Sequence, residues 1–177
     1  MQDRFVLTSQ WKLACDAQQV WALLDNVVEW PKWWPHVTHT SVQHPDNDDG
    51  IIRTVSLVWR TPLAYRLNLR VTRTRALPPL ELEGTVEGDL DGRGLWLLTS
   101  QNDDFVIITY RWDVRLSRPW MRRLAPLLRP VFAWNHFQVM RSGARGMAKQ
   151  LGCMLSEYRD MSPHTLGMPL GKKHQHV

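Results

Sequence analysis

The sequence has 177 residues, of which 44% are hydrophobic and 22% charged, and its formal net charge is +5 at pH 7. That size and balance fit one soluble globular domain, and no apolar run approaches the ~20 residues of a membrane-spanning helix. The first ten residues alternate instead of forming a signal core, and Cys15 and Cys153 form no CxxC pair, so we expect a cytoplasmic protein without a disulfide framework or zinc site.

The N-terminal part of the chain predicts one strand followed by two short helices. Residues 4–14 alternate between apolar and polar side chains, as a half-buried strand does. Asp16 can cap a helix over residues 17–25, and Asn26 can cap a second short helix directly after it. We therefore expect a strand–helix–helix start.

The tryptophan-rich segment VVEWPKWWPHV, residues 27–37, predicts a rigid corner. Trp30 and Trp34 each precede a proline, and the residue before a proline favours extended backbone. Each buried Trp removes ~150–250 Å² from water, so the rings are expected to fill one end of the core. The alternative is that Trp30, Trp33 and Trp34 form the rim of a pocket.

The middle of the chain predicts an antiparallel meander, which begins with an extended run at 36–44. Turn signals (DNDDG, TP, LPP, DGRG and NDD) then separate five strand-like segments: 51–59, 64–76, 80–90, 94–101 and 105–117. Arg73 and Arg75 break the alternation of the second segment, which predicts a bulge. Apolar side chains share one face of the last segment, so this face has to be covered: Val106, Ile108, Tyr110, Trp112 and Val114.

One long helix over residues 131–158 is predicted to cover that face. One stripe of it recurs at helical spacing: Phe132, His136, Met140, Gly143, Met147, Leu151 and Met154. Gly143 and Gly146 weaken a helix by roughly 1 kcal/mol each relative to Ala, which indicates close approach to the sheet or room left for a guest. We expect residues 1–160 to form the domain and residues 161–177 to be a flexible C-terminal tail.

Four stretches of this order resemble a known superfamily: VWALLDNVVEWPKWWPHV, GDLDGRGLWLL, YRWDV and FAWNHFQVMRSGARGMAKQL. They are similar to the polyketide cyclase/dehydrase-like branch of the SRPBCC, or START-like helix-grip, superfamily, over roughly residues 4 to 155. The resemblance implies an α+β fold in which a curved antiparallel sheet wraps around a long C-terminal helix, with two short helices after the first strand. It also implies an apolar cavity between sheet and helix.

The predicted function is binding of a hydrophobic small molecule, lipid-like, aromatic or polyketide-like, in that cavity. The expected ligand-binding residues come from two strands, the last strand and the long helix: Tyr65, Leu67, Trp96, Tyr110, Trp112, Phe132, His136 and Met140. His136 lies on the apolar stripe between Phe132 and Met140, where an imidazole can donate to a ligand carbonyl. No cofactor is implied.

Two alternatives stay open. A polyketide cyclase or dehydratase would use the same pocket, with His136 or a tyrosine moving a proton, although no catalytic residue is assigned. A peripheral membrane protein would use residues 118–130, where apolar side chains such as Trp120 and Leu127 alternate with arginines and contact an anionic membrane weakly. Pro126 and Pro130 argue against one continuous helix there.

Other classes find little support in the sequence. His36, His39 and His44 lack a Cys or acidic partner at ligand spacing, so we expect solvent-facing histidines and no metal. Between Asp113 and Glu157 there is no acidic residue but there are eight basic ones, a one-sign field most often found on a solvated helix face. No nucleic-acid-binding motif surrounds them, so no nucleic-acid partner is expected, and the oligomeric state is left open.

Overall fold

From the first strand to the long helix, the elements follow the predicted order. A computed structural model describes residues 4–44, 53–101 and 104–161. The elements are β1 (Arg4–Leu13), α1 (Ala17–Asp25), a short 3₁₀ turn (Val27–Glu29), α2 (Trp30–Trp33), β2 (Val37–His44), β3 (Thr54–Arg60), β4 (Arg66–Leu77), β5 (Glu81–Gly88), β6 (Leu90–Gln101), β7 (Phe105–Leu116), α3 (Pro119–Leu151) and β8 (Leu155–Met161). The predicted turn at 46–50 and the tail beyond Met161 lie outside the described residues.

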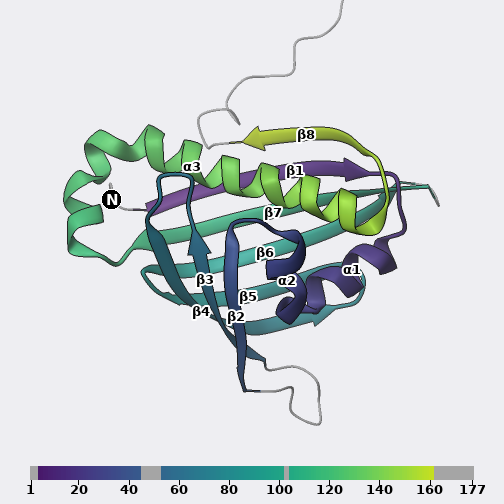
Figure 1. The fold of residues 1–177 in the computed structure, drawn as a ribbon, viewed down its shortest axis with the longest axis horizontal. Coiled ribbons are helices and arrows are strands. Elements are labelled where there is room, and N and C mark those ends of the chain that lie inside the picture. The colour runs from purple at the N-terminus through teal and green to yellow at the C-terminus, as the bar shows by residue number, and fades with distance from the viewer. Residues whose placement is uncertain (1–3, 45–52, 102–103, 162–177) are drawn as a thin grey trace, which may run out of the picture.

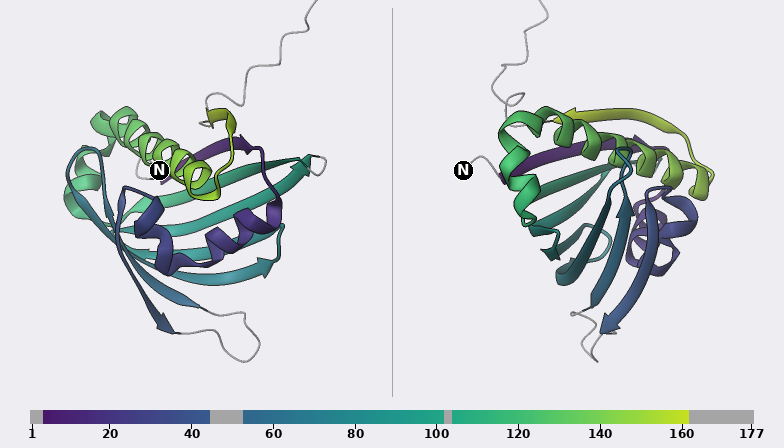
Figure 2. Two further views of the ribbon diagram at one scale, coloured as in Figure 1. Left: turned by 45° about the vertical axis from the view of Figure 1, so that its right-hand side comes forward. Right: turned by 60° about the vertical axis from the view of Figure 1, so that its left-hand side comes forward.

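The strands within these ranges form one antiparallel sheet in the order β2-β3-β4-β5-β6-β7-β1-β8. Strands β2 to β7 pair with their neighbours in sequence, while β1 returns to pair with β7 and β8 adds to the edge of β1. The sheet curves strongly, and α1, α2 and α3 all lie on its concave side (Figures 1 and 2). The helix-grip arrangement is therefore confirmed.

The concave face carries the core because side chains alternate across each strand. In β1, alternate residues from Phe5 to Leu13 are buried, and in β7 the predicted inner face from Val106 to Val114 faces α3. The predicted bulge in β4 is present as a register shift between Arg73 and Arg75. Within the described ranges, no helix combines the length and the apolar character needed to cross a bilayer.

Helix α3 begins twelve residues earlier than predicted, because Pro126 and Pro130 do not break it. Each proline leaves the carbonyl four residues before it without a helical N–H. Both carbonyls belong to exposed residues, Arg122 and Pro126, where water can bond to them. Pro119 lies in the first turn, where the missing N–H removes no helical bond. The expected interruption over residues 118–130 is thus wrong.

The C-terminal end of α3 was also misplaced. The helix ends at Leu151, and Gly152 adopts left-handed backbone with φ of 66°. Its N–H bonds to the carbonyls of Ala148 and Lys149, which is a typical helix end. Residues 155–158, predicted to be helical, begin β8, and Met154 is 63% exposed instead of lying on the buried stripe.

The DGRG sequence at 91–94 was predicted to be a turn, but it lies inside β6. The β5–β6 hairpin turns at Asp89 instead. A Cβ at Gly92 would lie 2.1 Å from the Asp113 carbonyl oxygen on β7, so the glycine permits the strands to approach. A turn residue and a crowded strand residue look alike in sequence, because both require glycine.

A candidate ligand cavity between the sheet and the long helix

An apolar cavity lies between the concave face of the sheet and the first two-thirds of α3. Its volume is about 100 Å³, measured as the space open to the centre of a water-sized sphere. Seven of the eight predicted ligand-binding residues line it: Tyr65, Leu67, Tyr110, Trp112, Phe132, His136 and Met140. They come together because β4 and β7 turn this face toward α3 and because 132, 136 and 140 lie on one side of the helix.

The remaining predicted residue, Trp96, lines a second apolar cavity of about 90 Å³. The two cavities share a wall formed by Trp59, Leu69, Tyr110 and Trp112. The Trp96 ring lies 4.1 Å from that of Tyr110, centre to centre. One aromatic partition therefore separates two spaces that together extend across the concave face.

Three residues that line the first cavity carry buried polar atoms without a partner among the described residues: Trp59 Nε1, Asn135 Oδ1 and His136 Nε2. Most buried polar atoms in proteins are hydrogen-bonded, and an unsatisfied one costs roughly 1–3 kcal/mol. Asn135 is 4% exposed, and its Nδ2 donates to the Tyr65 hydroxyl at 3.2 Å. The lining thus combines mostly apolar side chains with a few buried polar atoms.

Asn135 and Trp59 were not among the predicted site residues. Asn135 lies three positions after Phe132, so the helical spacing that selected His136 places it beside the same face. Trp59 lies near the end of β3, and its register opposite Leu67 of β4 brings it to the cavity. The sequence carried a signal for Asn135 but none for the strand register.

The titratable groups of the cavity are held uncharged. Burial lowers the pKa of His136 to about 3, so its imidazole is neutral at pH 7. Burial raises the pKa of Tyr110 well above its ordinary value. Burial also raises that of Tyr65, although a hydrogen bond with Thr61 opposes the change. His136 and the two tyrosines therefore offer neutral hydrogen-bonding groups to a guest.

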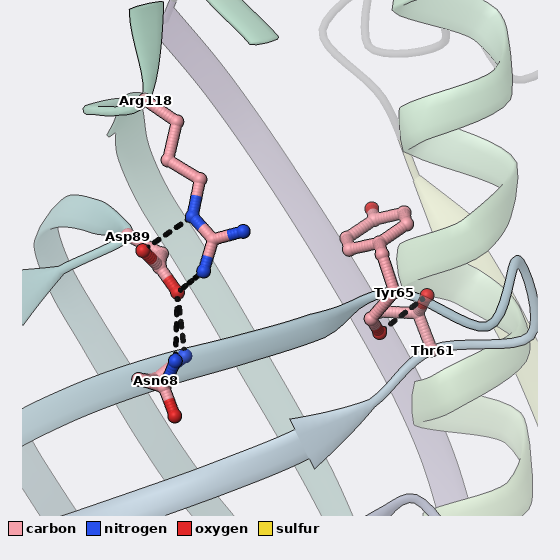
Figure 3. Close-up of polar contacts among 5 residues, drawn as sticks. All are labelled: Thr61, Tyr65, Asn68, Asp89 and Arg118. Atoms are coloured by element: carbon pink, nitrogen blue, oxygen red, sulfur yellow. Dashed lines mark hydrogen bonds and ion pairs between the residues drawn. The ribbon is translucent and has the colours of Figure 1, made fainter. Parts of the chain in front are cut away.

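The turn before β4 and the start of α3 are fixed by two polar contacts (Figure 3). Thr61 Oγ1 donates to the Tyr65 carbonyl at 3.1 Å, which holds the turn that carries the Tyr65 ring. Arg118, immediately before α3, donates through Nε and Nη2 to the carboxylate of Asp89, each at 2.5 Å. Asp89 also accepts the backbone N–H of Asn68 at 2.7 Å. These contacts hold the turn before β4 in place and join the start of α3 to the β5–β6 turn and to β4.

The ion pair also sets the charge of Asp89. Burial opposes ionisation of this carboxyl, but the hydrogen bonds from Arg118 and Asn68 outweigh it and lower the pKa of Asp89. Asp89 sits at the β5–β6 turn, so the pair joins that turn to the residue immediately before α3.

The tryptophan corner packs α2 against α3. Trp34 Nε1 donates to the Val139 carbonyl at 2.9 Å, and its ring lies 4.8 Å from that of Trp59 and 5.3 Å from that of Trp33. Trp33 and Trp34 are both buried and line neither cavity, whereas Trp30 lines the second one. The corner therefore belongs mainly to the core at one end of the grip.

Backbone geometry in the corner matches the prediction at one tryptophan only. Trp34 is extended, with φ of −107° and ψ of 100°, as expected before a proline. Trp30 is helical, with φ of −52° and ψ of −40°, so its expected extended backbone is wrong. Pro31 lies in the first turn of α2, where a proline is tolerated because that N–H has no helical partner.

The glycines of α3 meet this corner and not the sheet. A Cβ at Gly143 would lie 2.4 Å from the Trp34 ring, and one at Gly146 would lie 1.9 Å from the Trp33 carbonyl oxygen. Neither glycine lines either of the two cavities described above. The interpretation that they approach the sheet or leave room for a guest is replaced by close contact between α2 and α3.

Metal-ligand side chains do not gather in the part of the chain that the structure describes. His39 is exposed, and His36 Nδ1 bonds to the Arg60 carbonyl at 2.8 Å. The side chain of His44 lies outside the described residues.

Comparisons with known proteins agree with this architecture. A family model described as polyketide cyclase / dehydrase and lipid transport matches residues 4–152. No curated protein is significantly similar in sequence. The solved di-domain ARO/CYC StfQ from the steffimycin biosynthetic pathway aligns with 17% identity and a TM-score of 0.60, over 85% of this chain and 53% of StfQ, so the chain spans about half the length of that protein.

Two further solved structures are similar along nearly their whole length. A START superfamily protein from Mycobacterium smegmatis shares 11% identity with a TM-score of 0.65, over 84% of this chain and 97% of that one. The Zhui aromatase/cyclase from a Streptomyces species shares 11% identity with a TM-score of 0.66, over 84% and 94% respectively. At such identities the likeness concerns the fold, which is the START-like one.

Proposed function

Because the chain belongs to the polyketide cyclase / dehydrase and lipid transport family, we propose that it binds a hydrophobic small molecule in the cavity between α3 and the sheet. The observation that carries the proposal is that three residues of a mostly apolar lining carry buried polar atoms without a partner among the described residues. Binding sites for small molecules combine an apolar lining with few polar groups that fix orientation. A lipid-like, aromatic or polyketide-like ligand fits this description.

The polar end of the ligand follows from the chemistry of the three atoms. Trp59 Nε1 can only donate, and Asn135 Oδ1 can only accept. His136 Nε2 does one or the other according to its tautomer. A hydroxyl group both donates and accepts, so a ligand that ends in a hydroxyl or phenol has the chemistry to bond to Asn135 Oδ1 or to Trp59 Nε1. Each bond so formed is worth about 0.5–1.5 kcal/mol net.

A second candidate is an aromatase/cyclase-type enzyme, which the similarity to StfQ and to the Zhui protein brings into consideration. It would use His136 or a tyrosine for proton transfer. The charge states favour binding instead, because a general acid or base works best with a pKa near the working pH. Burial places the pKa of His136 at about 3 and raises those of Tyr65 and Tyr110.

Titration with the uncharged aromatic probe N-phenylnaphthylamine tests the binding proposal. His136→Gln keeps a hydrogen-bonding group at similar reach, and His136→Ala removes it. For a ligand identified by mass spectrometry of the purified native protein, we expect Gln to keep most of the affinity and Ala to lose about 0.5–1.5 kcal/mol. His36→Gln, on the surface, is the matched control.

Two results would contradict the proposal. Wild-type protein that neither takes up the probe nor carries a ligand has no binding cavity. Affinities that are equal in wild type and both His136 variants make His136 a core residue. Turnover of an aromatic polyketide substrate that falls roughly 10²–10⁴-fold in both variants would instead establish the enzyme.

A further inference from the structure

An apolar stripe runs along the outer side of the first half of α3. Its five side chains are large and exposed, at 43%, 41%, 77%, 37% and 48%: Trp120, Leu124, Leu127, Val131 and Trp134. Their spacing of four, three, four and three residues puts them on one line of a helix. We name these five residues the outer stripe.

The outer stripe is a feature of this half of the helix alone. The same line continues through Gln138, Ser142 and Arg145, which are polar. The inner side of the first half is buried, with Met121 at 1% and Phe132 at 8% exposed, so the fold does not need the outer stripe for its core. Figure 1 shows this half at the edge of the molecule, beyond the end of β8.

The turn between β3 and β4 extends the apolar surface. It carries Leu63, which is 43% exposed, and Tyr65, whose ring lies 6.3 Å from that of Trp120 in an edge-to-face contact. Tyr65 also lines the ligand cavity. The outer stripe therefore begins next to the cavity wall.

The charged side chains that α3 itself carries beside the outer stripe are all basic. Arg122 and Arg123 are exposed, and Arg123 lies one helical turn from both Trp120 and Leu127. No acidic residue occurs between Asp113 and Glu157. An apolar helix face bordered by arginines, with a tryptophan at each end, has the character of a helix that lies in the interface of an anionic bilayer.

We propose that the outer stripe docks the protein onto an anionic lipid surface. Self-association of two copies through the same line is disfavoured, because the arginines beside the apolar seam of one copy would face and repel those of the other. A lipid surface with acidic headgroups offers both the apolar phase and the opposite charge. This docking does not depend on occupancy of the cavity.

Flotation of the full chain with lipid vesicles tests the proposal. Wild-type protein is expected to float with vesicles of phosphatidylcholine and phosphatidylglycerol, and much less with phosphatidylcholine alone. Leu127→Glu removes the most exposed apolar side chain and should weaken partitioning at least about tenfold. Arg123→Gln should weaken it about fivefold.

Matched variants elsewhere keep the test specific. Leu80→Glu changes an exposed leucine, 56% accessible, before β5, and Arg145→Gln changes an exposed arginine beyond the outer stripe on the same helix. Both should partition as wild type does. Unchanged uptake of N-phenylnaphthylamine by Leu127→Glu shows that the cavity and fold are intact.

Several results would overturn the proposal. If the wild-type protein does not bind anionic vesicles, lipid docking is ruled out. If it binds both vesicle types equally, the preference for anionic lipid is ruled out. Equal loss in Leu80→Glu and Leu127→Glu removes the role of the outer stripe. A dimer in sedimentation that Leu127→Glu abolishes, together with no vesicle binding, assigns the stripe to self-association.

Discussion

The two halves of α3 are built for different tasks. From Val139 to Leu151 the helix is clamped, because Gly143 and Gly146 admit the Trp34 ring and the Trp33 carbonyl to its backbone. From Pro119 to Trp134 it has no such clamp: Met121 and Phe132 on its inner side line the cavity, and its outer side leaves the outer stripe exposed. One continuous helix therefore joins a packed half to an open half.

This difference shows how a helix-grip fold separates stability from binding. Close backbone contact fixes the second half of α3 against Trp33 and Trp34, and the first half has no equivalent contact at a glycine. At the open end the Arg118–Asp89 pair holds the start of α3, and a Thr61 hydrogen bond holds the turn that carries Tyr65. Substitutions where α3 meets Trp33 and Trp34 should change stability, and those on the outer stripe should leave it nearly unchanged.

The largest effect is expected for Gly146→Ala in the packed half. The new Cβ would lie 1.9 Å from the Trp33 carbonyl oxygen, so the backbone of α2 would have to move. We expect the free energy of unfolding to fall by about 3 kcal/mol, although alanine favours the helix by ~1 kcal/mol. Urea unfolding measures it. The exposed neighbour Arg145→Ala should stay within about 0.5 kcal/mol of wild type, and equal stability of the two variants would mean that α2 is not clamped.

Trp34→Phe should have the next largest effect. The change removes the 2.9 Å hydrogen bond to the Val139 carbonyl and part of a buried ring. The expected loss is about 2 kcal/mol, from a small cavity and a missing hydrogen bond. Trp120→Phe, on the outer stripe, is the control and should cost less than about 0.5 kcal/mol. Similar losses for the two would erase the distinction between the halves.

His136 lies between the halves and should make stability depend on pH. Its folded pKa of about 3 lies below the ordinary 6.5, so the unfolded chain takes up the proton first as the pH falls. The contribution is fully present above the unfolded pKa and is lost as the pH drops toward the folded one. In that window the wild type should lose roughly 1 kcal/mol per pH unit more than His136→Gln. Urea unfolding of both proteins at neutral pH and about two pH units lower checks this. Equal dependence of the free energy of unfolding on pH in the two proteins would mean that the imidazole is exposed to water.

The smallest effect on stability is expected for Leu127→Ser in the open half. Leu127 is 77% exposed, so the folded chain gains little from its side chain. The free energy of unfolding should change by less than about 0.5 kcal/mol in thermal or urea unfolding. A loss above about 1 kcal/mol would show that the outer stripe is packed in the folded protein.

Much of the candidate site could be read from the sequence because its signals are local. Helical spacing put Phe132, His136 and Met140 on one side of α3, and strand alternation put Tyr110 and Trp112 on one face of β7. Asn135 and Trp59 were missed, since their importance lies in unpaired atoms, Oδ1 and Nε1, that only packing reveals. The glycines of α3 were recognised as unusual, but their partner on α2 could not be identified from the helix alone.

Contacts between residues distant in sequence could not be predicted from the sequence either. Cys15 and Cys153 gave no pattern, yet the pairing of β8 with β1 brings them together. Burial raises the pKa of the Cys15 thiol to about 12, and a hydrogen bond with Cys153 contributes less to this change. β8 itself was hidden because the helical pattern seemed to continue past Gly152, where the helix ends.

The sequence by itself determined the fold class, the order of elements and the inner face of the sheet, because the periods of strands and helices depend on neighbouring residues only. Tertiary structure decided where α3 begins and ends, which residues the glycines of α3 contact, and which polar atoms stay unpaired beside the cavity. These depend on what one element meets on another, as when Pro126 and Pro130 continue a helix because Arg122 and Pro126 are exposed, and Gly146 accommodates the Trp33 carbonyl.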